Sequence, residues 1–175
     1  MKSFARLGGL AAAWAGAMLI SCVSNDRGAH LLDVPFSEQP VDRCGPVAVA
    51  MVARFHGVSP DGEALERDIH VPALSGSIPA LLAEGARRQG LAAEVRSCTE
   101  TEIYSLIGEG LPLIVMLAPA GVDPRGHFVV VTGCNPRTGA LRVHSGSRPN
   151  QWLAPEAWRD RWVQAGCLIV LIRPY

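Results

Sequence analysis

Cys44 and His127 are the residues of this sequence whose types could together perform nucleophilic chemistry. A thiol becomes a strong nucleophile only when it ionises, and a neighbouring imidazole can take its proton. The protonated imidazole could then pass that proton to a leaving group and later deprotonate water. Cys44 begins a helical pattern, where unpaired N–H groups and a partial positive charge favour a thiolate. The pair therefore predicts attack on an acyl carbon.

An oxyanion formed by such an attack needs hydrogen-bond donors close to Cys44. The backbone N–H of Cys44 is one candidate, and the side-chain amide of Gln39, just upstream, is another. Each of the three residues also has a purely structural interpretation. Cys44 could be a small core residue, His127 a satisfied histidine at a strand edge, and Gln39 part of a loop surface.

The segment that starts at Cys44 predicts a helix over residues 44–56. Four of its apolar residues fall on one face at helical spacing: Val47, Ala50, Met51 and Phe55. Pro46 suits the first turn, where its missing N–H is not needed, and Gly57 suits the position after the last turn. Upstream, the short alternating run 31–36 predicts a strand and the polar run 37–43 predicts a loop.

The remaining sequence predicts four more helices, over 62–69, 78–89, 99–108 and 155–164. Asp61 and Ser77 are expected to cap the first two, and Thr99 forms a capping box with Glu102 at the third. Five further strands are predicted, over 91–96, 111–117, 127–133, 140–145 and 167–172. Most helices precede most strands. This order predicts an α+β fold, with N-terminal helices packed on a C-terminal antiparallel sheet.

The composition excludes several classes of function. Apolar residues make up 49% of the chain, charged residues 18%, and the formal net charge is zero. This composition is typical of a globular domain with a single core. Without a basic excess, we expect no nucleic-acid partner. The spacing of His127, Cys134 and His144 matches no short metal-binding motif and no phosphate-binding loop is present, so we expect no cofactor.

Three segments carry a resemblance to a known family. Residues 33–36 (DVPF) with Gln39, then Cys44-Gly45-Pro46, then residues 126–133 (GHFVVVTG) resemble the papain-like, bacteriocin-processing (double-glycine) cysteine peptidase family. The resemblance covers nearly all of residues 31–173. It implies a papain-like fold over 31–175 and thiol-dependent hydrolysis of a peptide or protein substrate. Carried over residue by residue, it makes Cys44 the nucleophile, His127 the base and Gln39 the oxyanion donor.

One position departs from the family pattern. The family usually places an Asp on the strand after the His strand, where it orients the imidazole, and this sequence has Ser145 there. A hydroxyl can accept a hydrogen bond from the imidazole but cannot stabilise imidazolium by charge. Asn150 and Asp123 therefore remain alternatives to Ser145. Two other functions also stay open: a degenerate relative that binds a peptide without cutting it, and an acyl transferase.

The N-terminus predicts export. Lys2 and Arg6 precede the uncharged run 7–20, which is typical of a signal peptide over residues 1–21. Leu19-Ile20-Ser21-Cys22 resembles the lipobox of bacterial lipoproteins. The resemblance implies a lipid on Cys22 as the membrane anchor and a tether over 22–30. The alternatives are an uncleaved anchor or a plain signal peptide. Val23, in place of an Asp, favours the periplasmic face of the outer membrane in a Gram-negative cell.

The other cysteines and one loop complete the expectations. Five Cys are present, and an exported protein can form disulfides. Cys134 and Cys167 each flank a predicted strand and could pair, or they could be small buried residues, as Cys98 could. His144 should point away from Ser145, toward the surface or beneath Trp152. The Gly/Pro-rich loop 119–126 leads into His127 and is expected to border the cleft. The oligomeric state stays open.

Overall fold

Among the residues that the structure describes, seven strands form one antiparallel sheet. In this computed structural model, residues 27–120 and 126–175 are described. The sheet order is β2-β7-β3-β4-β5-β6, and β1 pairs with β4. The strands are β1 His30–Leu31, β2 Ala92–Ser97, β3 Leu113–Leu117, β4 His127–Asn135, β5 Ala140–Ser145, β6 Arg148–Leu153 and β7 Leu168–Arg173. The predicted signal peptide, Cys22 and Asp123 lie outside the described residues.

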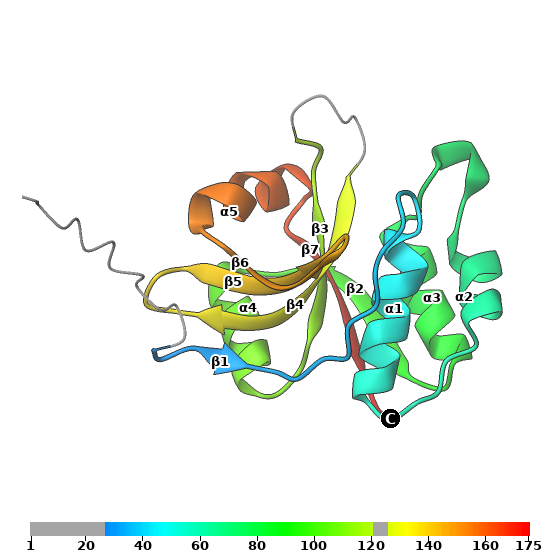
Figure 1. The fold of residues 1–175 in the computed structure, drawn as a ribbon, viewed down its shortest axis with the longest axis horizontal. Helices are drawn as coiled ribbons and strands as arrows, with labels where there is room; N and C mark the ends of the chain where they lie inside the picture. The colour runs from blue at the N-terminus through cyan, green and yellow to red at the C-terminus, as the bar shows by residue number, and fades with distance from the viewer. Residues whose placement is uncertain (1–26, 121–125) are drawn as a thin grey trace, which may run out of the picture.

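Helices cover both faces of the sheet (Figure 1). On one face lie α1 Cys44–Phe55, α2 Gly62–Ile69 and α3 Pro79–Arg88, and on the other lie α4 Glu100–Gly108 and α5 Pro155–Gln164. Successive side chains along a strand point to opposite faces, so the same strands contribute to a hydrophobic core on each face of the sheet. Ile114 and Val130 face α1, whereas Val115 and Val131 face the opposite side. The α+β class predicted from the sequence is confirmed, since the helices do pack on an antiparallel sheet.

Helix α1 is the central helix of its layer and agrees with the predicted segment. It is buried around most of its circumference, because the sheet lies on one side and α2 and α3 lie on the other. Met51 and Val52 on adjacent positions are both fully buried. Gly57 adopts a positive φ of 78° directly after the helix, which ends it as expected.

The start of α3 differs from the prediction. Asp61 caps α2 by accepting from the Ala64 N–H, as predicted, and the Thr99–Glu102 capping box begins α4. Ser77, however, does not cap α3: the N-cap is Ile78, and no side chain caps it. The pattern was misleading because Pro79 fixes the start of the helix one residue later than a Ser77 cap requires. The short 3-10 helix Pro72–Leu74 before it was not predicted.

Two strand predictions need correction. The predicted strand 31–36 is reduced to β1, because the chain then leaves the sheet and is held by side chains. One of these contacts is the hydrogen bond that His144 Nε2 donates to the Val34 carbonyl at 2.8 Å. Strand β6 was missed because Pro149 and the positive φ of Asn150 break a strand pattern. An edge strand tolerates both.

The hydrogen bond to Val34 also corrects the position of His144. Its side chain is 1% exposed, so the expected surface position is wrong.

The second helical layer fixes the ends of β3 and β7. Trp158 and Trp162 are both buried on α5, with ring centroids 5.7 Å apart, as their spacing predicts. The Trp162 indole N–H donates to the Leu168 carbonyl at 3.2 Å. At the same end, the backbones of Ala118 and Arg161 are joined by a 2.9 Å hydrogen bond. These contacts place the last turn of α5 beside the end of β3.

Of the two alternatives for Cys134 and Cys167, the structure shows no disulfide between them. All four described cysteines are free thiols, and Cys134 is buried with its thiol toward the Tyr104 carbonyl. Cys167 instead lies across from Cys98, whose N–H donates to the Cys167 carbonyl at 3.1 Å. Cys98 follows β2 and Cys167 precedes β7, and these two strands pair with each other. Predicting strands along the sequence does not show which strands pair.

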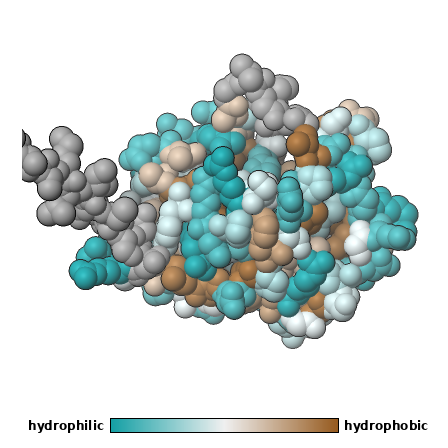
Figure 2. Space-filling view, in the orientation of Figure 1, coloured by the Kyte–Doolittle hydropathy of each residue, from teal (hydrophilic) through white to brown (hydrophobic). Residues whose placement is uncertain are grey.

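The surface gives two further observations. Figure 2 shows hydrophobic residues on the face in view as small separate areas among hydrophilic ones, without a broad apolar patch over its described part. Within residues 27–120 and 126–175, no helix is both long and apolar enough to cross a membrane.

Candidate active site

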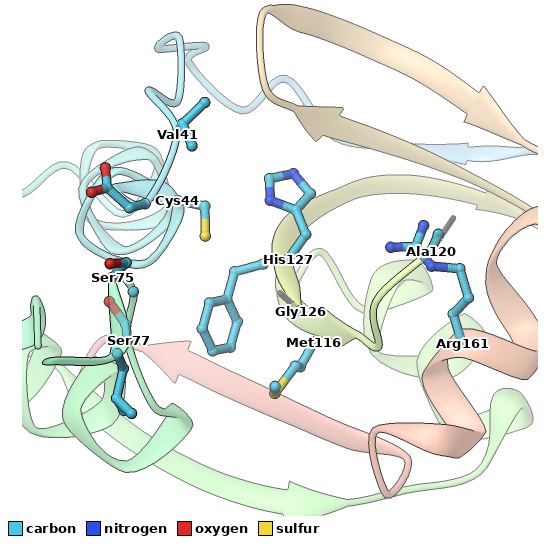
Figure 3. Close-up of a pocket in the computed structure, with 13 residues that line it drawn as sticks. Val41, Cys44, Ser75, Ser77, Met116, Ala120, Gly126, His127 and Arg161 are labelled. Carbon is cyan, nitrogen blue, oxygen red and sulfur yellow. The ribbon is translucent and has the colours of Figure 1, made fainter. Parts of the chain in front are cut away.

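A pocket of about 480 Å³ lies where the N-terminal end of α1 meets the ends of β3 and β4. Residues 41–44 and 74–77 form its helical side, and Met116 with residues 126–128 forms its sheet side. Figure 3 shows the Cys44 side chain extending from α1 toward β4, with the His127 ring on the facing side. Ala120 and Gly126 also line the pocket, so the described ends of loop 119–126 border it, as expected.

Cys44 is the first residue of α1 and is 9% exposed. Burial raises the pKa of its thiol above the ordinary value, and the Asp42 carboxylate adds to this rise. Hydrogen bonds from the backbone N–H groups of Phe128, Gly45 and Cys44 itself lower the pKa but do not offset the burial. The helix start thus acts in the direction that the sequence predicts, yet burial outweighs it. Thiolate formation at neutral pH therefore depends on a base.

His127 is the first residue of β4, and its ring lies beside the Ser145 hydroxyl. The distance from His127 Nε2 to Ser145 Oγ is 3.0 Å. With the hydrogen on Nε2 donated to Ser145, Nδ1 carries the lone pair that a general base needs. Asn150, one alternative orienting residue, contacts His144 and Thr132 instead. The other alternative, Asp123, lies outside the described residues.

Gln39 connects the three elements that carry the site. Its amide nitrogen donates to the Cys44 carbonyl at 3.2 Å and to the Phe128 carbonyl at 3.1 Å. Its Oε1 accepts from the Gly146 N–H at 2.9 Å, in the turn that follows Ser145. The side chain is buried, so the loop-surface interpretation is wrong. Both amide hydrogens point at carbonyl oxygens in this structure, which sequence reasoning could not reveal.

Gly45 and Ser77 make a close contact under the start of α1. A Cβ at position 45 would lie 2.6 Å from Ser77 Oγ and 2.8 Å from Ser77 Cβ, so only glycine fits there. The Ser77 hydroxyl is buried and has no hydrogen-bond partner among the described residues. This contact explains why a glycine follows Cys44, and it brings residues 75–77 to the wall of the pocket.

Sequence reasoning missed two groups that line the pocket. Asp42 has a positive φ of 69° and its carboxylate lies 3.1 Å from the Arg43 guanidinium. Arg161, on α5, reaches the pocket from the opposite layer. Asp42 stands close enough to Cys44 in the sequence to have been suspected. Arg161 gave no signal, because its place depends on how α5 packs beside β3.

Metal binding finds no support in the described part of the chain. No group of three or more His, Cys, Asp or Glu side chains there could hold a metal ion. The spacing of Cys134 and His144 from His127 matches no short metal-binding motif. In the structure the Cys134 thiol points toward the Tyr104 carbonyl, and His144 donates to the Val34 carbonyl.

A comparison with protein families identifies the family of the chain. The model of the Peptidase_C39 like family matches residues 31–170. The chain belongs to this family. The match runs from the second residue of β1 to the middle of β7, and it includes Gln39, Cys44 and His127. Membership implies the cysteine peptidase class that the resemblance in the sequence indicated. No curated protein matches the chain.

Solved structures of C39 peptidases share the fold. The chain is 19% identical to a double-glycine motif protease from an AMS/PCAT transporter, solved with its leader peptide, with a TM-score of 0.64 over 86% of this chain and 96% of that one. The chain is 16% identical to a C39-like peptidase from Bacillus anthracis, with a TM-score of 0.68 over 84% of this chain and 98% of that one. The chain is 19% identical to the peptidase domain of Streptococcus ComA, a bifunctional ABC transporter of a quorum-sensing pathway. The TM-score is 0.64 over 83% of this chain and 99% of that one.

Proposed function

We propose that this C39-like domain is an active cysteine peptidase that hydrolyses a peptide or related amide through a thioester on Cys44. One observation carries the proposal: Cys44 at the start of α1 and His127 at the start of β4 line the same pocket, and Ser145 holds the His127 ring from behind at 3.0 Å. A merely structural cysteine and histidine have no reason to meet in a cavity with the imidazole's second nitrogen anchored.

The steps follow from these positions. His127 Nδ1 takes the thiol proton while the Cys44 sulfur bonds to the carbonyl carbon of the substrate. The resulting oxyanion accepts hydrogen bonds at the N-terminal end of α1, where the Cys44 N–H lies. His127 then donates its proton to the amine nitrogen as the C–N bond breaks, leaving the thioester. Water, deprotonated by His127, cleaves the thioester and restores the thiol.

Gln39 has two roles in this proposal. Its amide ties the carbonyls of Cys44 and Phe128 together, so it fixes the spacing between the nucleophile and the base. It becomes an oxyanion donor when substrate binding releases one of these two hydrogen bonds. The family resemblance supports the second role, and the geometry of the substrate-free site supports the first.

A binding module without catalysis is the second candidate. Two observations favour it: Ser145 stands where the family has an acid, and burial raises the pKa of the Cys44 thiol. A neutral partner cannot stabilise imidazolium by charge, which weakens proton transfer from Cys44 to His127. Acyl transfer to an amine is a variant of the first proposal, because it uses the same thioester.

Peptide turnover tests the proposal. The wild type, Cys44→Ala and His127→Ala proteins are each incubated with a peptide library, and new termini are identified by mass spectrometry. We expect cleavage by the wild type and none above background in either variant. Peptides that bind the wild type and stay intact would support the binding module instead. Hydroxylamine added to the reaction should give peptide hydroxamates, and amide products with added amines would identify acyl transfer.

We also propose that the domain acts in the cell envelope, tethered by lipid on Cys22. The support is the lipobox-like Leu19-Ile20-Ser21-Cys22 after an uncharged run with basic residues before it. Two or more acyl chains on one residue give stable anchoring. Mass spectrometry of the mature N-terminus should find acylated Cys22, and Cys22→Ala should release the protein from membranes. An unmodified Cys22 in the mature protein would contradict this location.

A further inference from the structure

Arg161 reaches the active-site pocket from α5, on the layer opposite to Cys44. Its Nε donates to the Ala118 carbonyl at 2.9 Å, and its own carbonyl accepts from the Ala118 N–H at 2.9 Å. These two bonds fix both the backbone and the stem of the side chain. Figure 3 shows Arg161 beside Ala120, on the far side of His127 and Met116 from Cys44. The guanidinium is therefore held in place before any substrate arrives.

The terminal nitrogens of Arg161 have no partner among the described residues. A guanidinium has five N–H donors, and the bond to Ala118 uses one of them. Arg159 on the same helix is a useful contrast, since Glu100 binds its Nε at 2.7 Å and its Nη2 at 2.6 Å. The helix thus carries one arginine that pairs with the Glu100 carboxylate through two nitrogens and one that lines the pocket with N–H donors not used by the described residues.

The charges around the pocket leave Arg161 available to a ligand. Asp42, the other charged residue of the described lining, lies on the helical side with its carboxylate 3.1 Å from the Arg43 guanidinium. Much of the remaining lining is apolar, including Leu74, Met116 and Phe128. Apolar walls strengthen the attraction between a fixed cation and an incoming anion.

From this geometry we propose that Arg161 is a specificity-determining residue that binds a carboxylate of the substrate near the scissile bond. Its open edge suits bidentate pairing with a carboxylate, and its fixed stem reduces the ordering cost of binding. The inference rests on the proposed function, because it assigns the substrate class of the same site. The carboxylate is either the side chain of Asp or Glu or the free C-terminus of a short peptide.

Peptide binding and cleavage test this assignment together. Fluorescein-labelled hexapeptides with an Ala/Leu framework carry one Glu, Gln or Lys at each position in turn, with either a free or an amidated C-terminus. Affinity is measured on Cys44→Ala, which cannot turn over, and kcat/KM is measured on the protein with Cys44 intact. We expect a Glu peptide, or a free-acid peptide, to be preferred by about tenfold to a hundredfold over its neutral counterpart. The position and the C-terminal arm distinguish the two carboxylate sources.

Variants of Arg161 separate recognition from structure. Arg161→Gln should abolish the carboxylate preference, so that the acidic peptide and its neutral counterpart are cleaved with equal kcat/KM. Arg161→Glu should reverse the preference toward the Lys peptide, a change that loss of packing cannot produce. Arg173→Gln on the exposed end of β7 is the matched control and should keep the preference. Thermal denaturation of each variant verifies folding.

The outcomes for the two proposals are distinguishable. Cleavage without any carboxylate preference, or cleavage with a preference that survives Arg161→Gln, would overturn the role of Arg161 and leave the peptidase proposal intact. Binding with a preference that Arg161→Gln removes, but without cleavage, would support Arg161 and overturn catalysis. Absence of both binding and cleavage across the peptide set would overturn the carboxylate assignment.

Discussion

At the scale of single residues, the proposed chemistry depends on Cys44, on His127 and on the Ser145 hydroxyl that contacts the His127 ring. Burial raises the pKa of the Cys44 thiol, so the thiolate forms only when His127 accepts the proton. Ser145 anchors Nε2 of that imidazole by a hydroxyl rather than by a carboxylate. This hydrogen bond fixes the orientation of the His127 ring, and fixing the orientation does not require a charged partner. The Ser145 hydroxyl itself adds no charge that would stabilise imidazolium.

Restoring the acid tests this division of roles. Ser145→Asp should raise the pKa of the His127 imidazole relative to the wild type by about one to three units, because a carboxylate stabilises imidazolium. NMR titration of nitrogen-labelled histidine measures the shift. Ser147→Asp adds the same charge at an exposed position in the following turn and is the matched control. Equal shifts in both variants would show that Ser145 has no special contact with the ring.

At the scale of elements, the start of α1 is fixed by its contact with the segment before α3. Gly45 lies against Ser77 so closely that any Cβ would collide with it. Because Ser77 precedes a proline-fixed helix, it cannot retreat without moving residues 74–77 of the pocket wall. The glycine between Cys44 and Pro46 is therefore a packing requirement of the site.

Gly45→Ala is expected to destabilise the fold by about 1 to 3 kcal/mol, the usual cost of forcing extra volume into a packed site. Peptide turnover should fall as well, since residues 75–77 line the pocket. Urea denaturation measures the free energy of unfolding. Gly62→Ala is the matched control, because a Cβ there meets nothing within 4 Å. If Gly45→Ala were as stable as Gly62→Ala, the packing explanation would be wrong.

The same elements show what the sequence could and could not predict. The long helices and the buried strands were predictable, because their apolar periodicity and their caps at Asp61 and Thr99 are local signals. Ser77 and β6 were mispredicted where a proline overrides the local pattern. The position of Cys44 and His127 at one pocket, and the contact of Ser145 with the His127 ring, followed from the family resemblance. The clamp formed by Gln39 and the approach of Arg161 depend on tertiary packing, which no local pattern contains.

At the scale of the whole molecule, two histidines outside the active site tie stability to pH. Burial lowers the pKa of His144, and likewise of His56, below the ordinary value of 6.5. His144 donates to the Val34 carbonyl and accepts from the Asn150 N–H, so it is neutral in the fold. Protonation would remove the hydrogen bond that its Nδ1 accepts.

The domain should therefore lose stability in mild acid. As the pH falls below about 6.5, the unfolded chain binds protons that the folded His144 and His56 resist, so the free energy of unfolding decreases. Urea denaturation at several pH values between about 7.5 and 5 measures the slope. His144→Gln keeps one donor and one acceptor without titrating, and should make the slope shallower. An unchanged slope in this variant would contradict the contribution of His144.

The central claim is that Cys44 and His127 form one reactive pair in a C39-like fold. Iodoacetamide alkylation near neutral pH, followed by peptide mass spectrometry, tests it most directly. Burial raises the pKa of Cys98 and of Cys134 to about 11, so these thiols are slow internal references. We expect Cys44 to react at least about tenfold faster than both, and to fall to their rate in His127→Ala. Slow alkylation of Cys44 that is indifferent to His127 would contradict the account.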